Sequence, residues 1–170
     1  MVWGLASSAA VLVIGAAIST FPNLPIPGDL NSWSGFGEAG ARVGRLEAAI
    51  RAGGKESFVF SPHYKTSSLI WFHRPGQQRT YAQDIYGEKA LEYDYFPADR
   101  DLKGATGILI ITDQAQSKLD LERLTPYFDA VEPVDVIETV SSGRVVRRIE
   151  IYQATNYKGR PRRGKADAVH

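Results

Sequence analysis

The sequence predicts an α/β domain with a mixed, mainly parallel sheet flanked by helices, a C-terminal antiparallel hairpin and one preceding transmembrane helix. A strand–helix–strand pattern over Ser57–Ala82 indicates a β-α-β unit, with strands near 57–61 and 79–83 and a helix near 62–74. Such units build parallel sheets covered by helices. The apolar run GILIIT at 107–112 is typical of a central strand buried on both faces. Apolar and polar residues alternate around Ser141-Ser142-Gly143, which predicts a hairpin over 131–152.

Composition narrows the range of functions. The chain has 170 residues, which fits one domain, and it has no cysteine, so it forms neither a disulfide framework nor a thiolate metal site. Its net charge is +1, but residues 144–170 hold eight basic and two acidic residues, a net charge of +6, which leaves −5 for the first 143 residues. Because most of the chain is net acidic, we expect no nucleic-acid partner.

Residues 1–21 are predicted to form the transmembrane helix. Val2–Phe21 is a stretch of twenty residues without a charge, long enough to cross about 30 Å of hydrocarbon as a helix. A signal peptide and a buried helix of a soluble protein are the two alternatives. No Lys or Arg precedes the apolar run, which argues against the signal peptide.

Residues 22–36 are predicted to be a stiff linker out of the membrane. FPNLPIP at 21–27 contains three prolines and cannot continue a helix. Trp33 and Phe36 are aromatics of the kind found at membrane–water interfaces. Alternatively, they attach the next helix to the core.

The α/β domain is predicted to span 37–157. An amphipathic helix near 38–52 carries Val43, Leu46 and Ile50 on one face and ends at Gly53-Gly54. Ser61 and Pro62 together predict the start of the second helix, with Ser61 as its cap. A third helix is expected near 117–127. The basic tail at 158–170 is predicted to be disordered, and either binds anionic lipid headgroups or is simply solvated.

Five stretches along the chain resemble a single known family. They are DLNSWSGFGEAGARV, FVFSPHYKTSSLIWFHRPGQQRTY, the triplet Glu92-Tyr93-Asp94, LKGATGILIIT, and FDAVEPVDVIETVSSGRVVRRIEIYQATNYKGR. Together they resemble the C-terminal end of bacterial family 39 glycosyltransferases, which are multi-span membrane enzymes related to protein mannosyltransferases and to the aminoarabinose transferase of lipid A. The family often has Gly-Trp in place of Gly35-Phe36 and Gln-Tyr-Asp in place of the triplet.

The resemblance implies the C-terminal periplasmic part of a membrane glycosyltransferase that uses a polyprenyl-phosphate sugar donor. Its partners are then membrane lipid, the donor and acceptor, and the remaining transmembrane part of the enzyme. The location is the bacterial inner membrane, with the domain facing the periplasm or cell exterior. The family's catalytic acids lie in loops that have no counterpart here, so we expect this chain alone to transfer no sugar. The alternative is a self-standing, membrane-anchored binding or scaffolding domain.

The polar-aromatic loop at 84–103 is the candidate ligand-binding site. Loops of this length inside a small domain are often functional. Tyrosine rings suit the apolar face of a sugar, and carboxylates suit its hydroxyls. The alternative is that the tyrosines cover the sheet while the charges face water. The candidate residues are Tyr86, Glu92, Tyr93, Asp94 and Tyr95, with Asp84 as a further carboxylate.

No catalytic residue, metal site or cofactor motif is predicted. His63 and His73 lack the spacing of metal ligands, and a surface or capping role suits His63 best. Ser61, His63 and Asp113 could be combined into a triad, but no nucleophile-elbow motif supports it. The match of Gly35–Gly40 to G-x-G-x-x-G follows no strand, so it lacks the context of a phosphate loop.

Overall fold

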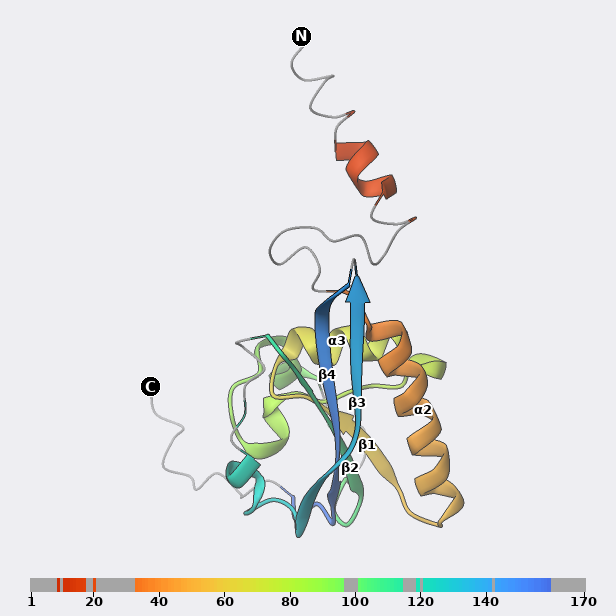
Figure 1. Ribbon diagram of the computed structural model, residues 1–170. Helices are drawn as coiled ribbons and strands as arrows, with labels where there is room; N and C mark the ends of the chain where they lie inside the picture. Colours follow the sequence, from red (N-terminus) through yellow and green to blue (C-terminus); the bar gives the residue numbers. More distant parts are fainter. Residues whose placement is uncertain are drawn as a thin grey trace, which may run out of the picture.

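The computed structural model describes residues 33–96, 101–114, 121–141 and 143–159, together with Leu119 and positions 9, 11–17 and 20. Two helices and four strands form the domain (Figure 1). In chain order they are α2 (Phe36–Ala52), β1 (Ser57–Phe60), α3 (Tyr64–His73), β2 (Thr106–Thr112), β3 (Ala130–Ser141) and β4 (Arg144–Thr155). Short 3-10 turns lie at Pro75–Gln77, Gln83–Tyr86, Leu91–Tyr95 and Leu121–Leu124.

The sheet is mixed, with the strand order β1-β2-β4-β3. β1 pairs with β2 in parallel, whereas β2–β4 and β3–β4 are antiparallel. The α/β class and the C-terminal hairpin are therefore confirmed, but a mainly parallel sheet is wrong. The expected strand at 79–83 is reduced to one parallel bridge between Phe60 and Tyr81, because a 3-10 turn begins at Gln83. The neighbour of β2 on the side away from β1 is β4, the second strand of the hairpin, and this pairing is antiparallel.

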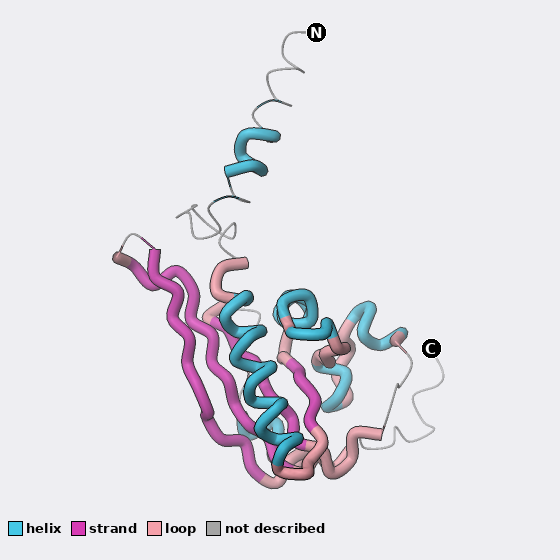
Figure 2. The backbone as a smooth tube through the Cα atoms, turned by 90° about the vertical axis from the view of Figure 1, so that its right-hand side faces the viewer, coloured by secondary structure: helices cyan, strands magenta, loops and turns pink. Residues whose placement is uncertain are grey.

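α2 and α3 cover one face of the sheet (Figure 2). The core on this face joins Phe36 and Val43 of α2 and Ile70 of α3 to isoleucines of the central strands. The two helices approach closely because Gly40 has no side chain: a Cβ there would lie 2.5 Å from the carbonyl oxygen of His73. Phe36, expected in the linker, is the first residue of α2 and is fully buried.

Aromatic side chains fill the opposite face of the sheet. Phe58 of β1 contacts Phe128 and Tyr157, and Phe60 contacts Phe128, with ring centroids 5.3 to 6.4 Å apart. Gly107 of β2 makes room for them, because a Cβ there would lie 2.8 Å from the Phe60 ring. β2 is thus buried on both faces, as its apolar run predicts.

Three sequence expectations meet a different outcome here. Within the described residues, the expected helix at 117–127 is only a 3-10 turn, Leu121–Leu124, because Pro126 disfavours the helical conformation of Thr125. Helix α3 begins at Tyr64, and its cap is His63 rather than Ser61. Lys158 lies in the domain rather than in a disordered tail, with its Nζ 3.1 Å from Asp129.

Most of the expected membrane segment, 2–21, lies outside the described residues. The described positions 11–17 are helical. Among the residues that the structure describes, no helix combines the length and the apolar character needed to cross a bilayer. The rest of the tail, from residue 160, also lies outside them.

Candidate functional site

The polar-aromatic loop folds as two 3-10 turns, Gln83–Tyr86 and Leu91–Tyr95. Two of its carboxylates hold this backbone. Asp84 is buried and accepts a hydrogen bond from the Ala82 N–H at 2.8 Å, and Asp94 accepts one from the Ala90 N–H at 2.9 Å. Both turns are therefore stabilised by side chains that the sequence assigned to ligand binding.

The predicted tyrosines fall into different environments. Tyr86 belongs to the aromatic core below the sheet, where its ring lies 6.2 Å from that of Tyr127, and burial raises its pKa. Tyr93 belongs to a separate cluster beside α3. Its hydroxyl lies 3.2 Å from Ser68 Oγ and 3.4 Å from Thr80 Oγ1, and burial raises its pKa as well. Neither buried tyrosine presents a ring face to solvent.

Tyr95, Glu92 and Asp94 remain exposed, and Tyr95 is 88% exposed. The structure therefore does not bring the five predicted residues into one site. The exposed three lie on a single turn, and their role as ligand-binding residues stays a prediction.

Two residues that sequence reasoning missed, Trp71 and Arg79, extend this turn into an aromatic patch. The Trp71 ring lies 5.9 Å from that of Phe96 in an edge-to-face arrangement. The Arg79 guanidinium carbon lies 4.8 Å from the centroid of the Tyr81 ring and 5.3 Å from that of Phe96, within cation–π range. The alternation Arg79-x-Tyr81 in an extended segment was the available signal, because such residues share one side of the chain. We define the aromatic patch as Trp71, Arg79, Tyr95 and Phe96.

The aromatic patch combines ring faces, a cation and neighbouring carboxylates. Trp71 is half-buried and donates its indole N–H to the Gln77 carbonyl at 2.7 Å, which holds the ring in place. Phe96 remains 40% exposed. Rigid ring faces beside carboxylates are the chemistry by which proteins recognise sugars, and an arginine adds affinity for phosphate.

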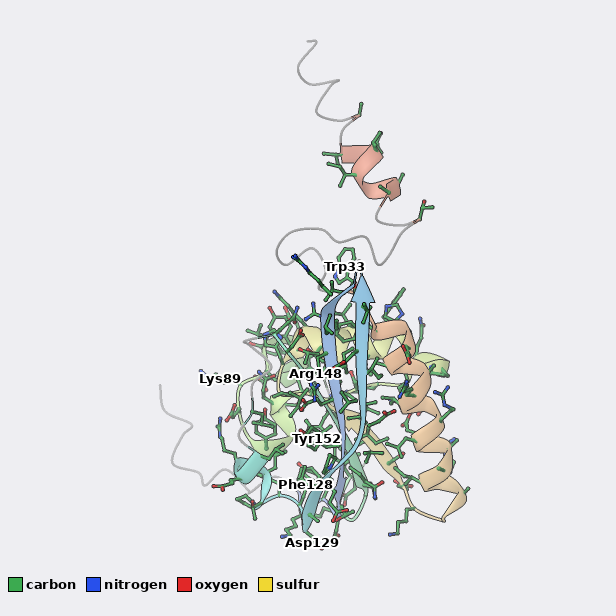
Figure 3. The ribbon with its side chains drawn as sticks, in the orientation of Figure 1. Trp33, Lys89, Phe128, Asp129, Arg148 and Tyr152 are labelled. Carbon is green, nitrogen blue, oxygen red and sulfur yellow. The ribbon has the colours of Figure 1, made fainter. Side chains whose placement is uncertain are left out.

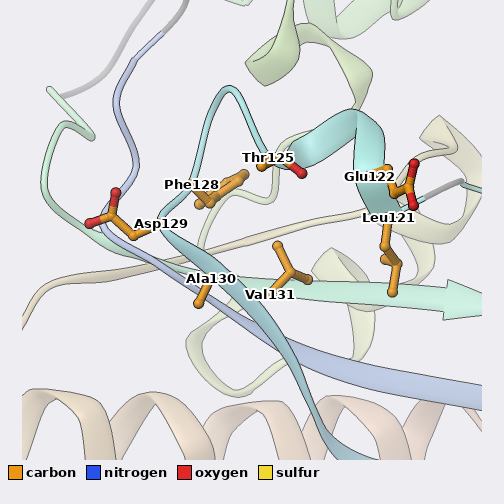
Figure 4. Close-up of a pocket in the computed structure, with 7 residues that line it drawn as sticks. All are labelled: Leu121, Glu122, Thr125, Phe128, Asp129, Ala130 and Val131. Carbon is orange, nitrogen blue, oxygen red and sulfur yellow. The ribbon is translucent and has the colours of Figure 1, made fainter.

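A small hollow lies under the 3-10 turn that precedes β3 (Figure 4). Its volume is about 220 Å³, below the roughly 300–1,000 Å³ of most small-molecule sites. Asp129 at its rim is engaged by Asn156 at 2.5 Å and by Lys158, and these contacts lower its pKa. The lining residues are Leu121, Glu122, Thr125, Phe128, Asp129, Ala130 and Val131.

A polar ladder crosses strands β3 and β4 at Arg148 and Tyr152, which Figure 3 labels. Arg148 pairs with Glu138 at 2.7 Å and with Glu150 at 2.9 Å. Tyr152 donates its hydroxyl to Glu150 at 2.7 Å. Tyr152 and Arg148 lower the pKa of Glu150. The charged and hydroxyl groups of this ladder are thus hydrogen-bonded to one another across β3 and β4.

The candidate triad of the sequence does not assemble. The ring of His63 accepts a hydrogen bond from the Lys65 N–H at 3.3 Å, as the cap of α3, and Asp113 pairs with Arg147 at 2.6 Å. Desolvation and then Lys65 lower the pKa of His63. Within the described part of the chain, no three His, Asp or Glu side chains are grouped so that they could hold a metal ion.

Taken together, fold and surface define an α/β domain with a mixed four-stranded sheet and an exposed aromatic patch on one side. No family model, curated protein or solved structure matches the chain.

Proposed function

We propose that the chain is the membrane-attached, extracytoplasmic C-terminal part of a glycosyltransferase that uses a polyprenyl-phosphate sugar donor. In this proposal the α/β domain does not transfer the sugar itself. It recognises donor or acceptor through the aromatic patch and the carboxylates of Glu92 and Asp94. The resemblance of the sequence to family 39 glycosyltransferases supplies the enzyme class.

Membrane attachment is supported by one observation above all. Val11, Leu12, Val13 and Ile14 are consecutive residues in a helical segment, and each is 56–73% exposed. A helix that is apolar on all sides is stable when it is buried in a large core or in lipid. These residues lie within Val2–Phe21, which is twenty residues long and carries no charge, and this length matches a bilayer rather than a protein contact.

The contacts of the polar-aromatic loop support a role in binding donor or acceptor and not in transferring the sugar. Asp84, the buried carboxylate, accepts a backbone hydrogen bond, and Tyr93 is held by Ser68 and Thr80. These groups support the loop. The exposed Tyr95 ring and the Arg79–Phe96 contact lie at its surface, where a sugar ring and a phosphate could be bound.

The test begins with the native polypeptide. An antibody raised against residues 33–159 should detect a membrane-bound polypeptide much larger than 18.7 kDa in the source cells. That polypeptide, purified in detergent, should transfer sugar from a polyprenyl phosphate, whereas the 170-residue chain alone should not. In the larger polypeptide, Tyr95→Ala should raise the KM for donor or acceptor, and Glu132→Ala on the exposed edge strand should not.

The outcomes separate the alternatives. A native polypeptide of 18.7 kDa in the membrane fraction would favour the self-standing, anchored binding or scaffolding domain. Sugar transfer by the chain alone would overturn the non-catalytic role, and release from membranes without detergent would overturn membrane attachment.

A further inference from the structure

The β3–β4 hairpin projects beyond the rest of the sheet, as Figure 2 shows. β2 pairs with β4 only as far as Ile149, and the Asp113 N–H after β2 donates to the Arg148 carbonyl at 3.0 Å, so the segment 144–147 of β4 pairs with β3 alone. At the tip, Val140 and Val145 lie directly opposite each other. They are 56% and 54% exposed. A cross-strand pair of β-branched side chains normally stabilises a sheet through packing.

The first described residues of the domain lie against the same tip. A Cβ on Gly35 would lie 2.5 Å from the Oγ1 of Thr139 and 3.6 Å from the Cγ of Arg147, the residue pair next to the valines. Trp33, two residues earlier, is 65% exposed, and Figure 3 places it beside the end of the hairpin. Three large apolar side chains from two distant parts of the chain therefore share one end of the domain.

The carboxylates near this end are already paired with the domain's own arginines. Asp113 pairs with Arg147 at 2.6 Å, and Glu138 pairs with Arg148 at 2.7 Å. Arg144, at the turn itself, is exposed. An apolar end with a cation at its margin suits the boundary between lipid tails and anionic headgroups, where aromatic rings are also enriched.

The length of chain before Trp33 points to the bilayer as the partner of this apolar end. The predicted membrane segment ends at Phe21, and eleven residues separate it from Trp33. We propose that the tip surface, defined as Trp33, Val140, Arg144 and Val145, docks onto the bilayer, with the apolar side chains at the tail boundary and Arg144 against lipid phosphate. This orients the domain with the N-terminal end of α2 toward the membrane. The inference rests on the membrane attachment proposed above.

The absence of cysteine makes the test direct, because one introduced thiol is the only labelling site. The full chain with Val140→Cys carries a nitroxide label and is reconstituted into vesicles of phosphatidylcholine with phosphatidylglycerol. The matched control is Lys55→Cys, which is exposed just beyond the far end of α2; the seventeen-residue helix places it about 25 Å from the tip. We expect the label at 140 to be accessible to oxygen and shielded from a water-soluble nickel reagent, and the label at 55 to show the opposite.

Two further variants test the parts of the surface. Arg144→Gln should lower the ratio of docked to undocked label by about fivefold in anionic vesicles, because one basic side chain near such a surface contributes about 1 kcal/mol. It should have no effect in phosphatidylcholine alone. The pair Trp33→Ser and Val145→Ser should undock the label in both kinds of vesicle.

Flotation of the vesicles separates this inference from membrane attachment. A chain that floats while the label at 140 stays in water overturns the docking surface and leaves attachment intact. A chain that does not float overturns both. A label that is immobilised only in the larger native polypeptide, and never in vesicles, overturns the lipid assignment in favour of a protein surface.

Discussion

The buried ion pair between Glu47 and Arg74 shows how single residues hold this domain together. Both side chains are almost fully buried, and the guanidinium of Arg74 also donates to the carbonyl oxygens of Gln78 and Arg79 at 3.1 and 3.2 Å. The pair therefore attaches α2 to the segment that leads into the Tyr81 bridge, and Arg79 of that segment belongs to the aromatic patch.

We predict that Glu47→Ala lowers the free energy of unfolding by about 3–5 kcal/mol, because it leaves the Arg74 charge buried and unpaired. Glu38→Ala on the same helix is the control. Glu38 pairs with Arg42 at 2.6 Å on the exposed surface, where such pairs contribute about 0–1 kcal/mol. Urea denaturation followed by circular dichroism measures both, and equal losses would contradict the role of the buried pair.

The two buried tyrosines predict how stability depends on pH. Burial raises the pKa of Tyr86 and of Tyr93 above the ordinary value, which is near 10. The folded state thus favours the neutral phenol, so this contribution is complete below about pH 10 and is lost as the pH rises through the folded-state pKa. The free energy of unfolding should therefore fall as the pH rises above about 10.

The double variant Tyr86→Phe, Tyr93→Phe should show a shallower fall, although Tyr93→Phe itself costs about 1 kcal/mol at neutral pH through its lost hydrogen bonds. Urea denaturation over an alkaline pH series measures the difference. Parallel curves for the two proteins would show that neither phenol is responsible.

At the scale of elements, the crossing of α2 and α3 depends on one missing side chain. Gly40 packs against the last carbonyl of α3, whereas a Cβ on Gly37, one turn earlier, would come no closer than 3.9 Å to its neighbour, His73 Nδ1. Helix α3 in turn carries Trp71, so the separation of the two helices sets the position of the aromatic patch.

We predict that Gly40→Ala lowers the free energy of unfolding by about 1–3 kcal/mol, because the methyl group forces the helices apart. Gly37→Ala should instead be neutral or raise it by up to about 1 kcal/mol, since alanine favours the helix and meets no obstacle. Thermal denaturation of both variants checks the contrast. A stabilised Gly40→Ala protein would mean that the two helices are not closely packed.

Strand β3 illustrates what a sequence pattern indicates about an element. Pro133 marks a register shift, and Val134, Val136 and Val140 of the strand are exposed, as suits the edge of a sheet. The proline within an apolar run was therefore a usable signal for an edge strand. The partner of β4 was not predictable in this way, because alternation predicts a face but not a neighbour.

At the scale of the whole molecule, the described core includes residues from Phe36 to Tyr157. Both residues are buried, at opposite ends of the domain's sequence, and the Tyr157 hydroxyl donates to the Ile85 carbonyl. The N–H of Lys158 donates to the Tyr127 carbonyl at 2.8 Å. The domain therefore extends slightly beyond both boundaries expected from the sequence.

We predict that residues 29–170, without the apolar segment, form a soluble protein with a single cooperative unfolding transition, whereas the full chain requires detergent. Size-exclusion chromatography and urea denaturation measure the two properties. If the shortened chain aggregates while the full chain stays soluble without detergent, the first segment belongs to the core and membrane attachment is wrong.

The sequence by itself determined the α/β class, helix α2, strands β1 and β2 and the hairpin. These follow from local periodicity and turn residues, which act within a few positions along the chain. Only the tertiary structure decided that β4 pairs with β2, that Tyr86 and Tyr93 are buried apart, and that Arg79 lies against Phe96. These features depend on which distant parts of the chain pack against one another. A short polar-aromatic stretch is equally typical of a ligand-binding loop and of a loop that packs over the hydrophobic core.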